Sequence, residues 1–309
     1  MALKLLRAFA AVLAAVATVG IFSAANAFGD STIPFTSGSD WTTFSADPGS
    51  TPFLETPNVL GPAQLVCMSQ VAPPSCPAGA TIYNSPFYGW TADLSPIPGA
   101  AWIWRPGIDG TSTPADLADY FFSKTLILDG APTGGTFYVA VDDYAAIRVN
   151  QQVVGTLGSV VDASLAGKHT SLTAFDISGY LRPGRNVITI EAQNGPWYFS
   201  GLCNPCSYAL NPAGVVFGGA VSFSPAGPGE QLGGLDLQEY CQSIGYDGVV
   251  LTKPRLGPGA AIDNWRCSGA GGLHPFSMEQ AGKWEYGLQA VQTHFLDRDD
   301  AYSWKCFAV

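Results

Sequence analysis

The chain has few charged residues and, past its first residues, no long apolar segment. Charged side chains make up 12% of its 309 residues, about half the usual share. There are 14 Lys and Arg against 24 Asp and Glu, so the formal net charge is -10. Such a chain repels phosphate backbones and anionic membranes, which excludes nucleic acid as a partner. Beyond the N-terminus nothing approaches the roughly 20 apolar residues of a membrane span, and we expect none.

Recognisable catalytic motifs are also missing. The sequence has no Ser-centred G-x-S-x-G, no H-E-x-x-H, no Gly-rich phosphate loop and no Cys/His catalytic pattern. Its three histidines, His169, His274 and His294, lack the spacing of metal ligands. We therefore expect no enzyme and no cofactor.

The first residues have the pattern of a secretory signal peptide. Lys4 and Arg7 precede an Ala-rich apolar run that ends in the small-residue sequence ANA. An uncleaved membrane anchor is the alternative, although it would usually be longer and carry more Leu and Ile. We predict a signal peptide over residues 1–27 and a protein that is secreted, extracellular or cell-surface-associated. Loss of the two cations takes the formal charge from -10 to -12.

Abundant glycine and proline indicate a turn-rich β protein. The chain has 36 Gly and 23 Pro, and past the signal peptide its periodicity is that of short strands. Antiparallel strands at this spacing favour an all-β fold, either a jelly roll or another β-sandwich. The clearest predicted strands are 120–128, 136–142, 145–150, 153–158, 186–194 and 214–223.

A Gly- and Pro-rich stretch divides the chain in two. Residues 224–233 read SPAGPGEQLG and have the composition of a domain linker. After it, residues 235–246 space their apolar side chains as in a short helix, and the tail is dense in Trp, Tyr and Cys. We predict a β-sandwich over residues 28–223 and a small Cys- and Trp-rich accessory module over residues 234–309.

Asp142 and Asp143 are adjacent carboxylates at the end of a predicted strand. Neighbouring side chains of a regular strand point to opposite faces, so these two cannot both face one substrate. A glycosidase needs two carboxylates that converge across one bond, about 5 to 10 Å apart. We expect an architectural role for both residues, and likewise for Asp176 and Glu191.

Five short motifs follow one another in the sandwich segment. They are Asp-Asp at 142–143, Val-Asn at 149–150, Phe-Asp-Ile-Ser at 175–178, Leu-Arg-Pro-Gly-Arg-Asn at 181–186 and Ala-Gln-Asn at 192–194. This series resembles the galactose-binding-domain-like jelly roll, a non-catalytic sandwich of bacterial glycosidases and carbohydrate-binding modules. The resemblance implies that one of the paired aspartates binds turn amides, and that the other faces solvent or helps to hold a structural calcium.

One position departs from that family pattern. Gln151 stands where the family usually has Gly after Asn150. A two-residue hairpin turn with positive φ prefers Asn-Gly, and a non-Gly residue costs about 1 kcal/mol there. We therefore expect a longer turn or a turn of another type.

Five tryptophans precede the linker, which is many for a β domain. Aromatic faces stack on the apolar C–H face of a sugar ring, although packing in the core is the alternative. Trp102 and Trp104 lie on one strand face. Trp197 follows Asn-Gly-Pro in a loop and is the best candidate for ligand contact, with Trp104 and Trp90 as further candidates.

Seven cysteines in an exported chain predict disulfides with one cysteine left over. Cys67 and Cys76 bracket a Pro-rich loop, while Cys203 and Cys206 form a C-x-x-C. Bonds within each set and bonds across the sets both remain open. A redox role for the C-x-x-C would normally need a thioredoxin-like βαβ context, which the sequence lacks.

The other three cysteines, Cys241, Cys267 and Cys306, lie in the module. With the motifs at 237–241, 245–246, 265–267, 284–287 and 302–306, the module resembles a small domain of secreted bacterial, chiefly actinobacterial, proteins. The resemblance implies a Cys where this chain has Gly282, so that a disulfide partner has been lost. Because Cys267 and Cys306 each follow an aromatic-rich run, we predict a bond between them and a free thiol at Cys241.

These patterns favour a secreted, non-catalytic protein that binds extracellular carbohydrate or cell-wall glycan. The rival hypothesis is a structural subunit of a surface layer, fibre or adhesin, for which low charge and exposed strand edges are suited and which would self-associate. A third hypothesis is a hydrolase without a visible motif.

Overall fold

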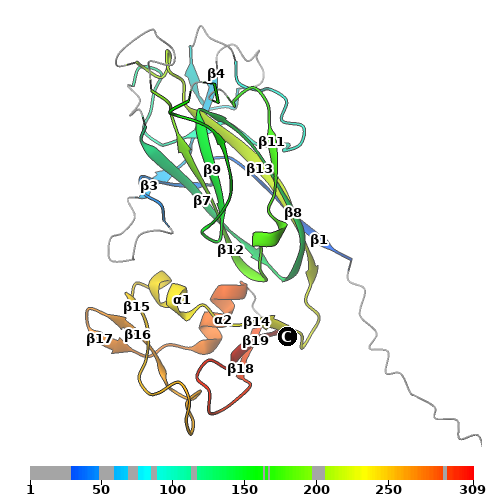
Figure 1. Cartoon of the computed structure of the whole chain (residues 1–309), viewed down its shortest axis with the longest axis vertical. Coiled ribbons are helices and arrows are strands. Elements are labelled where there is room, and N and C mark those ends of the chain that lie inside the picture. Colours follow the sequence, from blue (N-terminus) through cyan, green and yellow to red (C-terminus); the bar gives the residue numbers. More distant parts are fainter. Residues whose placement is uncertain are drawn as a thin grey trace, which may run out of the picture.

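A computed structural model describes residues 29–48, 59–68, 76–84, 89–112, 117–162, 164–165, 168–196, 206–287 and 291–309. The described residues are mostly strands, which form a two-sheet sandwich followed by a small module at one of its ends (Figure 1). The predicted signal peptide, Trp197 and Cys203 lie outside the described residues. None of the helices in the described ranges has the length and apolar character needed to cross a membrane.

The first sandwich sheet is built around the long antiparallel pair β8 and β13. Its strand order is β11-β8-β13-β6-β4-β5, and β1 also pairs with β13. A short 3-10 helix, η1 (Ser178–Tyr180), follows β11. The strands are β1 (Ser31–Thr36), β4 (Gln64–Met68), β5 (Thr81–Tyr83), β6 (Ile103–Trp104), β8 (Gly130–Asp142), β11 (Thr173–Asp176) and β13 (Gly214–Pro225).

The second sheet has the order β10-β9-β12-β7-β2-β3. Its strands are β2 (Thr42–Phe44), β3 (Val59–Pro62), β7 (Asp119–Leu128), β9 (Tyr144–Val149), β10 (Gln152–Gly158) and β12 (Gly184–Gln193). All six strands predicted from the sequence are therefore confirmed, as β7, β8, β9, β10, β12 and β13. The all-β, sandwich-type fold class is confirmed with them.

The core lies between the two sheets and follows the alternation of each strand. On β12, Ile188 and Ile190 are fully buried, and they face a layer that includes Phe137 and Phe217 of the other sheet. Full burial of each such side chain contributes about 1.5 to 3 kcal/mol to folding. The opposite face of the second sheet remains free to carry polar side chains.

Trp90 and Trp104 belong to this core, with 3% and 0% of their surface exposed. The Trp104 ring packs edge-on against Tyr120, and its Nε1 donates to the Tyr208 hydroxyl at 3.3 Å. The Trp90 ring stacks on Trp102 with the ring centroids 4.3 Å apart. Because these rings fill the space between the sheets and have no open face, the prediction that Trp90 and Trp104 contact a ligand is wrong.

The hairpin between β9 and β10 has a two-residue turn. Val149 pairs with Gln152, and the two central residues, Asn150 and Gln151, have φ values of 51° and 67°. The expectation of a longer or different turn is therefore wrong. Hydrogen bonds from the Asn150 side chain to Tyr180 and Asn186 hold the first of these two residues in the left-handed region.

The module combines two small three-stranded sheets, β14-β19-β18 and β15-β16-β17, with helices α1 and α2. The predicted helix after the linker is confirmed as α1, capped by the Asp236 carboxylate, which accepts from the Glu239 amide at 2.9 Å. The elements are β14 (Gln231–Gly233), α1 (Leu237–Ser243), β15 (Gly248–Leu251), β16 (Trp265–Gly269), β17 (Gly272–His274), α2 (Met278–Tyr286), β18 (Val291–Phe295) and β19 (Trp304–Ala308). The stretch predicted as linker, residues 224–233, thus contains the end of β13 and the whole of β14.

The disulfides confirm one pairing and correct another. Cys67 bonds Cys76, which is one of the pairings that the sequence left open. In the module Cys241 bonds Cys267, and Cys306 is a buried free cysteine, so the predicted Cys267–Cys306 bond and Cys241 thiol are wrong. The reason is topological: β16 and β19 belong to different small sheets. Cys206 is also disulfide-bonded.

Candidate ligand-binding groove

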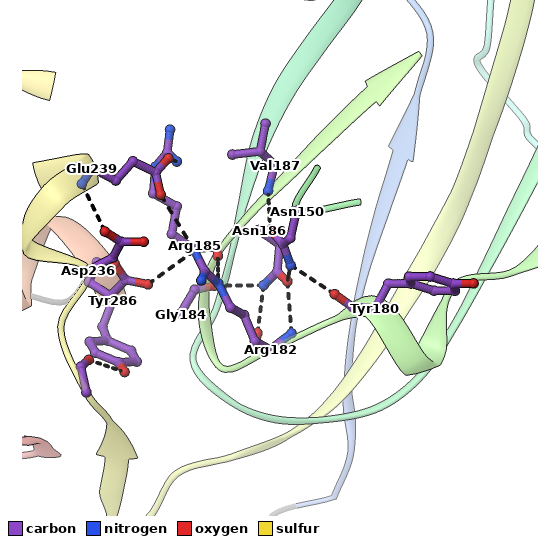
Figure 2. Close-up of polar contacts among 12 residues, drawn as sticks. Asn150, Tyr180, Arg182, Gly184, Arg185, Asn186, Val187, Asp236, Glu239 and Tyr286 are labelled. Carbon is purple, nitrogen blue, oxygen red and sulfur yellow. Dashed lines mark hydrogen bonds and ion pairs between the residues drawn. The ribbon is translucent and has the colours of Figure 1, made fainter. Parts of the chain in front are cut away.

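Two asparagines, one of them buried, fix the turn that leads into β12 (Figure 2). Asn186 is fully buried; its Oδ1 accepts from the Arg182 amide at 2.9 Å, and its Nδ2 donates to the carbonyls of Arg182 and Gly184. Asn150 Nδ2 donates to Asn186 Oδ1 and to the Tyr180 carbonyl, both at 2.9 Å. These bonds hold the turn at 182–185 in one conformation.

The same turn carries the polar contacts between the sandwich and the module. The Arg185 guanidinium pairs with Glu239 of α1 and lies over the Trp284 ring of α2, 4.8 Å from its centroid. Arg182 Nη2 lies 3.7 Å from Glu239 Oε2 and 3.7 Å from Glu285 Oε1. Figure 2 shows both arginines reaching from the turn towards α1. The turn thereby docks the module onto the end of the sandwich.

Gly184 lets the two parts approach closely. Its φ is +79°, and a β-carbon at this position would lie 2.7 Å from the Tyr286 ring and 2.9 Å from the Glu285 carbonyl oxygen. A side chain would therefore meet both an unfavourable backbone conformation and the wall of the module.

A groove of about 820 Å³ opens where α1 faces the outer surface of the second sheet. Outward positions of β7 and β12 form part of its floor, where the hydroxyls of Ser123 and Thr189 lie 3.2 Å apart on paired strands. We call this cavity the interdomain groove. Hydroxyl and amide side chains that line it are Thr42, Ser123, Thr125, Asn150, Gln151, Thr189, Gln238 and Gln242.

The charged side chains of the interdomain groove balance one another. Arg148 Nη1 lies 3.1 Å from Asp47 Oδ2, and the same guanidinium also pairs with Glu191. Lys124 pairs with Asp40. The groove is therefore nearly neutral inside a chain whose formal charge is -10. Its cations are Lys124, Arg148, Arg182 and Arg185, and its anions are Asp40, Asp47, Asp236 and Glu239.

Asp142 and Asp143 lie in the sandwich, joined by a cis peptide bond, and their carboxyl groups hydrogen-bond to each other. Strand β8 ends at Asp142, so the alternation that would separate the two side chains does not extend to Asp143. Asp143 Oδ2 accepts from the Gly195 amide at 2.8 Å, which confirms that one aspartate binds a backbone amide. Asp142 Oδ2 accepts from Trp90 Nε1 at 2.9 Å and its side chain is 14% exposed, so the expectation that it faces solvent is wrong.

Burial governs the acid–base behaviour of this pair. It raises the pKa of Asp142, and together with the Asp142 charge it raises the pKa of Asp143 to about 8. His169 Nδ1 lies 3.6 Å from Asp142 Oδ1, and burial lowers the His169 pKa. None of these three residues lines the interdomain groove. Among the described residues no group of three or more His, Cys, Asp or Glu has the arrangement of a metal site; the structural calcium stays a prediction.

Asp176 and Glu191, the other carboxylates for which we expected an architectural role, also have local partners. Asp176 accepts from the Ser178 amide at 2.9 Å, and hydrogen bonds from Ser178 lower its pKa. Glu191 pairs with Arg148. Sequence reasoning missed Arg148, Arg182 and Arg185 as groove residues, although two of them lie inside the Leu-Arg-Pro-Gly-Arg-Asn motif at 181–186.

Comparisons with known proteins give only partial structural matches. No family model matches the sequence, and no curated protein matches it. Among solved structures, the α-L-rhamnosidase of Streptomyces avermitilis is 21% identical over 38% of this chain and 10% of its own, with a TM-score of 0.28. The Aspergillus terreus α-L-rhamnosidase gives 17% identity over 36% of this chain and 13% of its own, with a TM-score of 0.27. The β-glucuronidase of Ruminococcus gnavus is 12% identical over 65% of this chain and 28% of its own, with a TM-score of 0.31. This chain spans less than a third of each.

Proposed function

We propose that this protein binds extracellular carbohydrate in the interdomain groove without catalysing a reaction on it. The observation that carries the proposal is the lining of that groove. Its 820 Å³ fall within the size of ligand sites in proteins. Eight hydroxyl and amide side chains line it, and each can both donate and accept hydrogen bonds, as the hydroxyls of a sugar require.

The charge balance of the groove favours a neutral glycan over a charged polymer. Four cations and four anions line the cavity, so neither a polyanion nor a polycation gains a net attraction there. Arg148 is fixed between Asp47 and Glu191 before any ligand arrives. A side chain that is already ordered loses little conformational entropy on binding.

The carboxylates of the groove support a non-catalytic role. A glycosidase acid keeps its proton because its pKa is raised, usually in an apolar pocket. Here Asp40, Asp47 and Glu239 each pair with a cation, and Asp236 caps α1. The carboxylates of the groove are therefore already engaged in structural contacts within the protein.

The disulfides fit an extracellular protein. Cys67–Cys76 and Cys241–Cys267 belong in an oxidising compartment, which is where extracellular glycans are met. We infer export through the signal peptide at residues 1–27.

A glycan array probed with the purified mature protein tests this function. Thr125 is exposed on β7 in the groove, so Thr125→Trp should fill the groove without disturbing the core and lower glycan binding more than tenfold. Thr156→Trp is the matched control, because Thr156 is exposed on β10 of the same sheet and outside the groove lining. Equal glycan binding by both variants would show that the glycan site does not lie in the groove. Filaments without glycan binding would favour a structural subunit, and release of sugar from a bound glycan would favour a hydrolase.

A further inference from the structure

The module holds a second cavity, of about 760 Å³, beside its contact with the sandwich. We call it the module pocket. Leu235, Val249 and Leu251 form an apolar part of its wall, and all three are only partly covered by the module core. Four aromatic side chains complete the wall: Trp265, Tyr286, Tyr302 and Trp304.

Two polar groups in the pocket wall lack partners within the described part of the chain. Glu285 is 4% exposed; its Oε1 lies 3.7 Å from Arg182 Nη2, but its Oε2 has no hydrogen-bond partner. Lys305, from the neighbouring strand β19, also lines the pocket and makes no ion pair with a described residue. A buried carboxyl oxygen without a partner is unfavourable, so this site is incomplete when empty.

We propose that the module pocket is a second carbohydrate site, in which a pyranose ring lies against the Trp304 side of the wall and its hydroxyls bond Glu285 and Lys305. The choice of a sugar rests on the proposed function of the groove and on the chemistry of the pocket. A pyranose has an apolar C–H face for the aromatic wall and hydroxyls at its edge. A purely apolar ligand would leave the Glu285 oxygen and the Lys305 ammonium desolvated without partners.

The Glu285 side chain can adjust to such a ligand. Burial, with Asp236 and Glu239 nearby, raises the pKa of Glu285 to about 7, while Arg182 opposes the shift. Near neutral pH the group can therefore either donate to or accept from a hydroxyl. Its terminal torsion is soft, so rotation of the carboxyl group can turn the unpartnered oxygen towards the pocket.

Two sites on one chain would raise the affinity of the protein for a polysaccharide. The interdomain groove and the module pocket are both adjacent to the Arg182 turn. Binding at one site makes binding of the same polysaccharide at the other intramolecular, so the protein would hold a polymer more tightly than either site holds a short sugar.

The test is fluorine NMR of the full mature chain labelled with 5-fluorotryptophan, with the Trp304 signal assigned by Trp304→Phe. The probes are the methyl glycosides of glucose, galactose and N-acetylglucosamine at millimolar concentrations, with cyclohexylmethanol as an apolar control. We expect a saturable shift of the Trp304 signal with at least one glycoside and none with cyclohexylmethanol. Lys305→Ala should weaken that response about tenfold. Lys283→Ala, on the exposed side of α2 beside Glu279, should not.

The outcomes separate this proposal from the groove. A Trp304 response that persists in Thr125→Trp supports a distinct module site. Glycan binding in the groove with a silent Trp304 signal overturns the module site alone, and so does an equal response to cyclohexylmethanol. A Trp304 response without any groove binding would instead refute the proposed groove function. If Lys305→Ala does not fold, Glu285→Gln, which keeps the side-chain shape, decides the same point.

Discussion

Asn150 and Asn186, 36 residues apart, are joined by a 2.9 Å hydrogen bond from the Nδ2 of the first to the Oδ1 of the second. Asn150 Oδ1 in turn accepts from the Val187 amide at 3.0 Å. This pair ties the β9–β10 hairpin to the turn before β12. Because that turn carries Arg182 and Arg185, the asparagines also set the position of the module and one wall of the interdomain groove.

Replacement of Asn186 should therefore destabilise the fold strongly. Asn186→Ala leaves the Arg182 amide and two carbonyl oxygens without their partners, and each unsatisfied buried group costs about 1 to 3 kcal/mol. We expect a loss of at least about 2 kcal/mol in the free energy of unfolding from urea titration. The exposed Gln152 in the same hairpin supplies the control, and Gln152→Ala should stay within about 0.5 kcal/mol of wild type. Equal stability of the two variants would show that the network does not hold the turn.

A side chain at position 184 should disturb the docking of the module. Gly184→Ala places a β-carbon 2.7 Å from the Tyr286 ring at a φ of +79°, so either the backbone or the module must move. We expect a loss of about 1 to 3 kcal/mol and faster proteolytic cleavage between residues 224 and 233. Gly179→Ala is the matched control, because its β-carbon would meet nothing within 4 Å. Unchanged cleavage in Gly184→Ala would contradict the close contact.

A cysteine at position 282 should pair with Cys306. A β-carbon on Gly282 would lie 3.0 Å from Cys306 Sγ, which matches the distance of about 3 Å between a β-carbon and the far sulfur of a disulfide. We expect Gly282→Cys to stabilise the protein by about 2 kcal/mol. The chain-entropy model gives about 3.5 kcal/mol for a loop of about 24 residues, and the shift that the Thr293 methyl must make reduces this gain.

Thiol labelling of unfolded, non-reduced protein followed by peptide mapping measures this pairing. The wild type should carry label on Cys306 and none on Cys241, and Gly282→Cys should lose the label on Cys306. Gly282→Ala isolates the crowding effect of the added carbon and should only destabilise. Label on both Cys306 and the new cysteine would refute the pairing.

The aspartate pair should make the protein less stable as the pH rises. The folded-state pKa of Asp143 is about 8 against an ordinary value of 3.8, so the folded state binds more protons between these values and its stability falls as the pH rises through them. His169 contributes with the opposite sign, because its lowered pKa reduces stability only as the pH falls below about 6.5.

Asp143→Asn removes the main titrating group of the pair. Between pH 5 and pH 8 its free energy of unfolding should fall less than that of the wild type, by on the order of 2 kcal/mol. Asp176→Asn is the control, since Asp176 is exposed with a lowered pKa and stays ionised across this range. A pH slope that Asp143→Asn leaves unchanged would show that the pair is ionised in the folded protein.

The sequence by itself determined the strands, the helix α1 and the sandwich class, because period-two alternation and turn residues act locally. It also marked Asn150 and Asn186 through ordered motifs. The tertiary structure decided what local pattern could not. The local sequence around Trp90 and Trp104 does not show whether protein or solvent covers their rings. The packing of the two sheets buries both. Likewise Cys267 bonds Cys241 because the chain returns β16 to α1 and sends β19 to another sheet, which no spacing along the sequence encodes. The interdomain groove exists only where α1 meets the outer face of strands more than 40 residues away, so its residues come together through the packing of segments that are distant in the sequence.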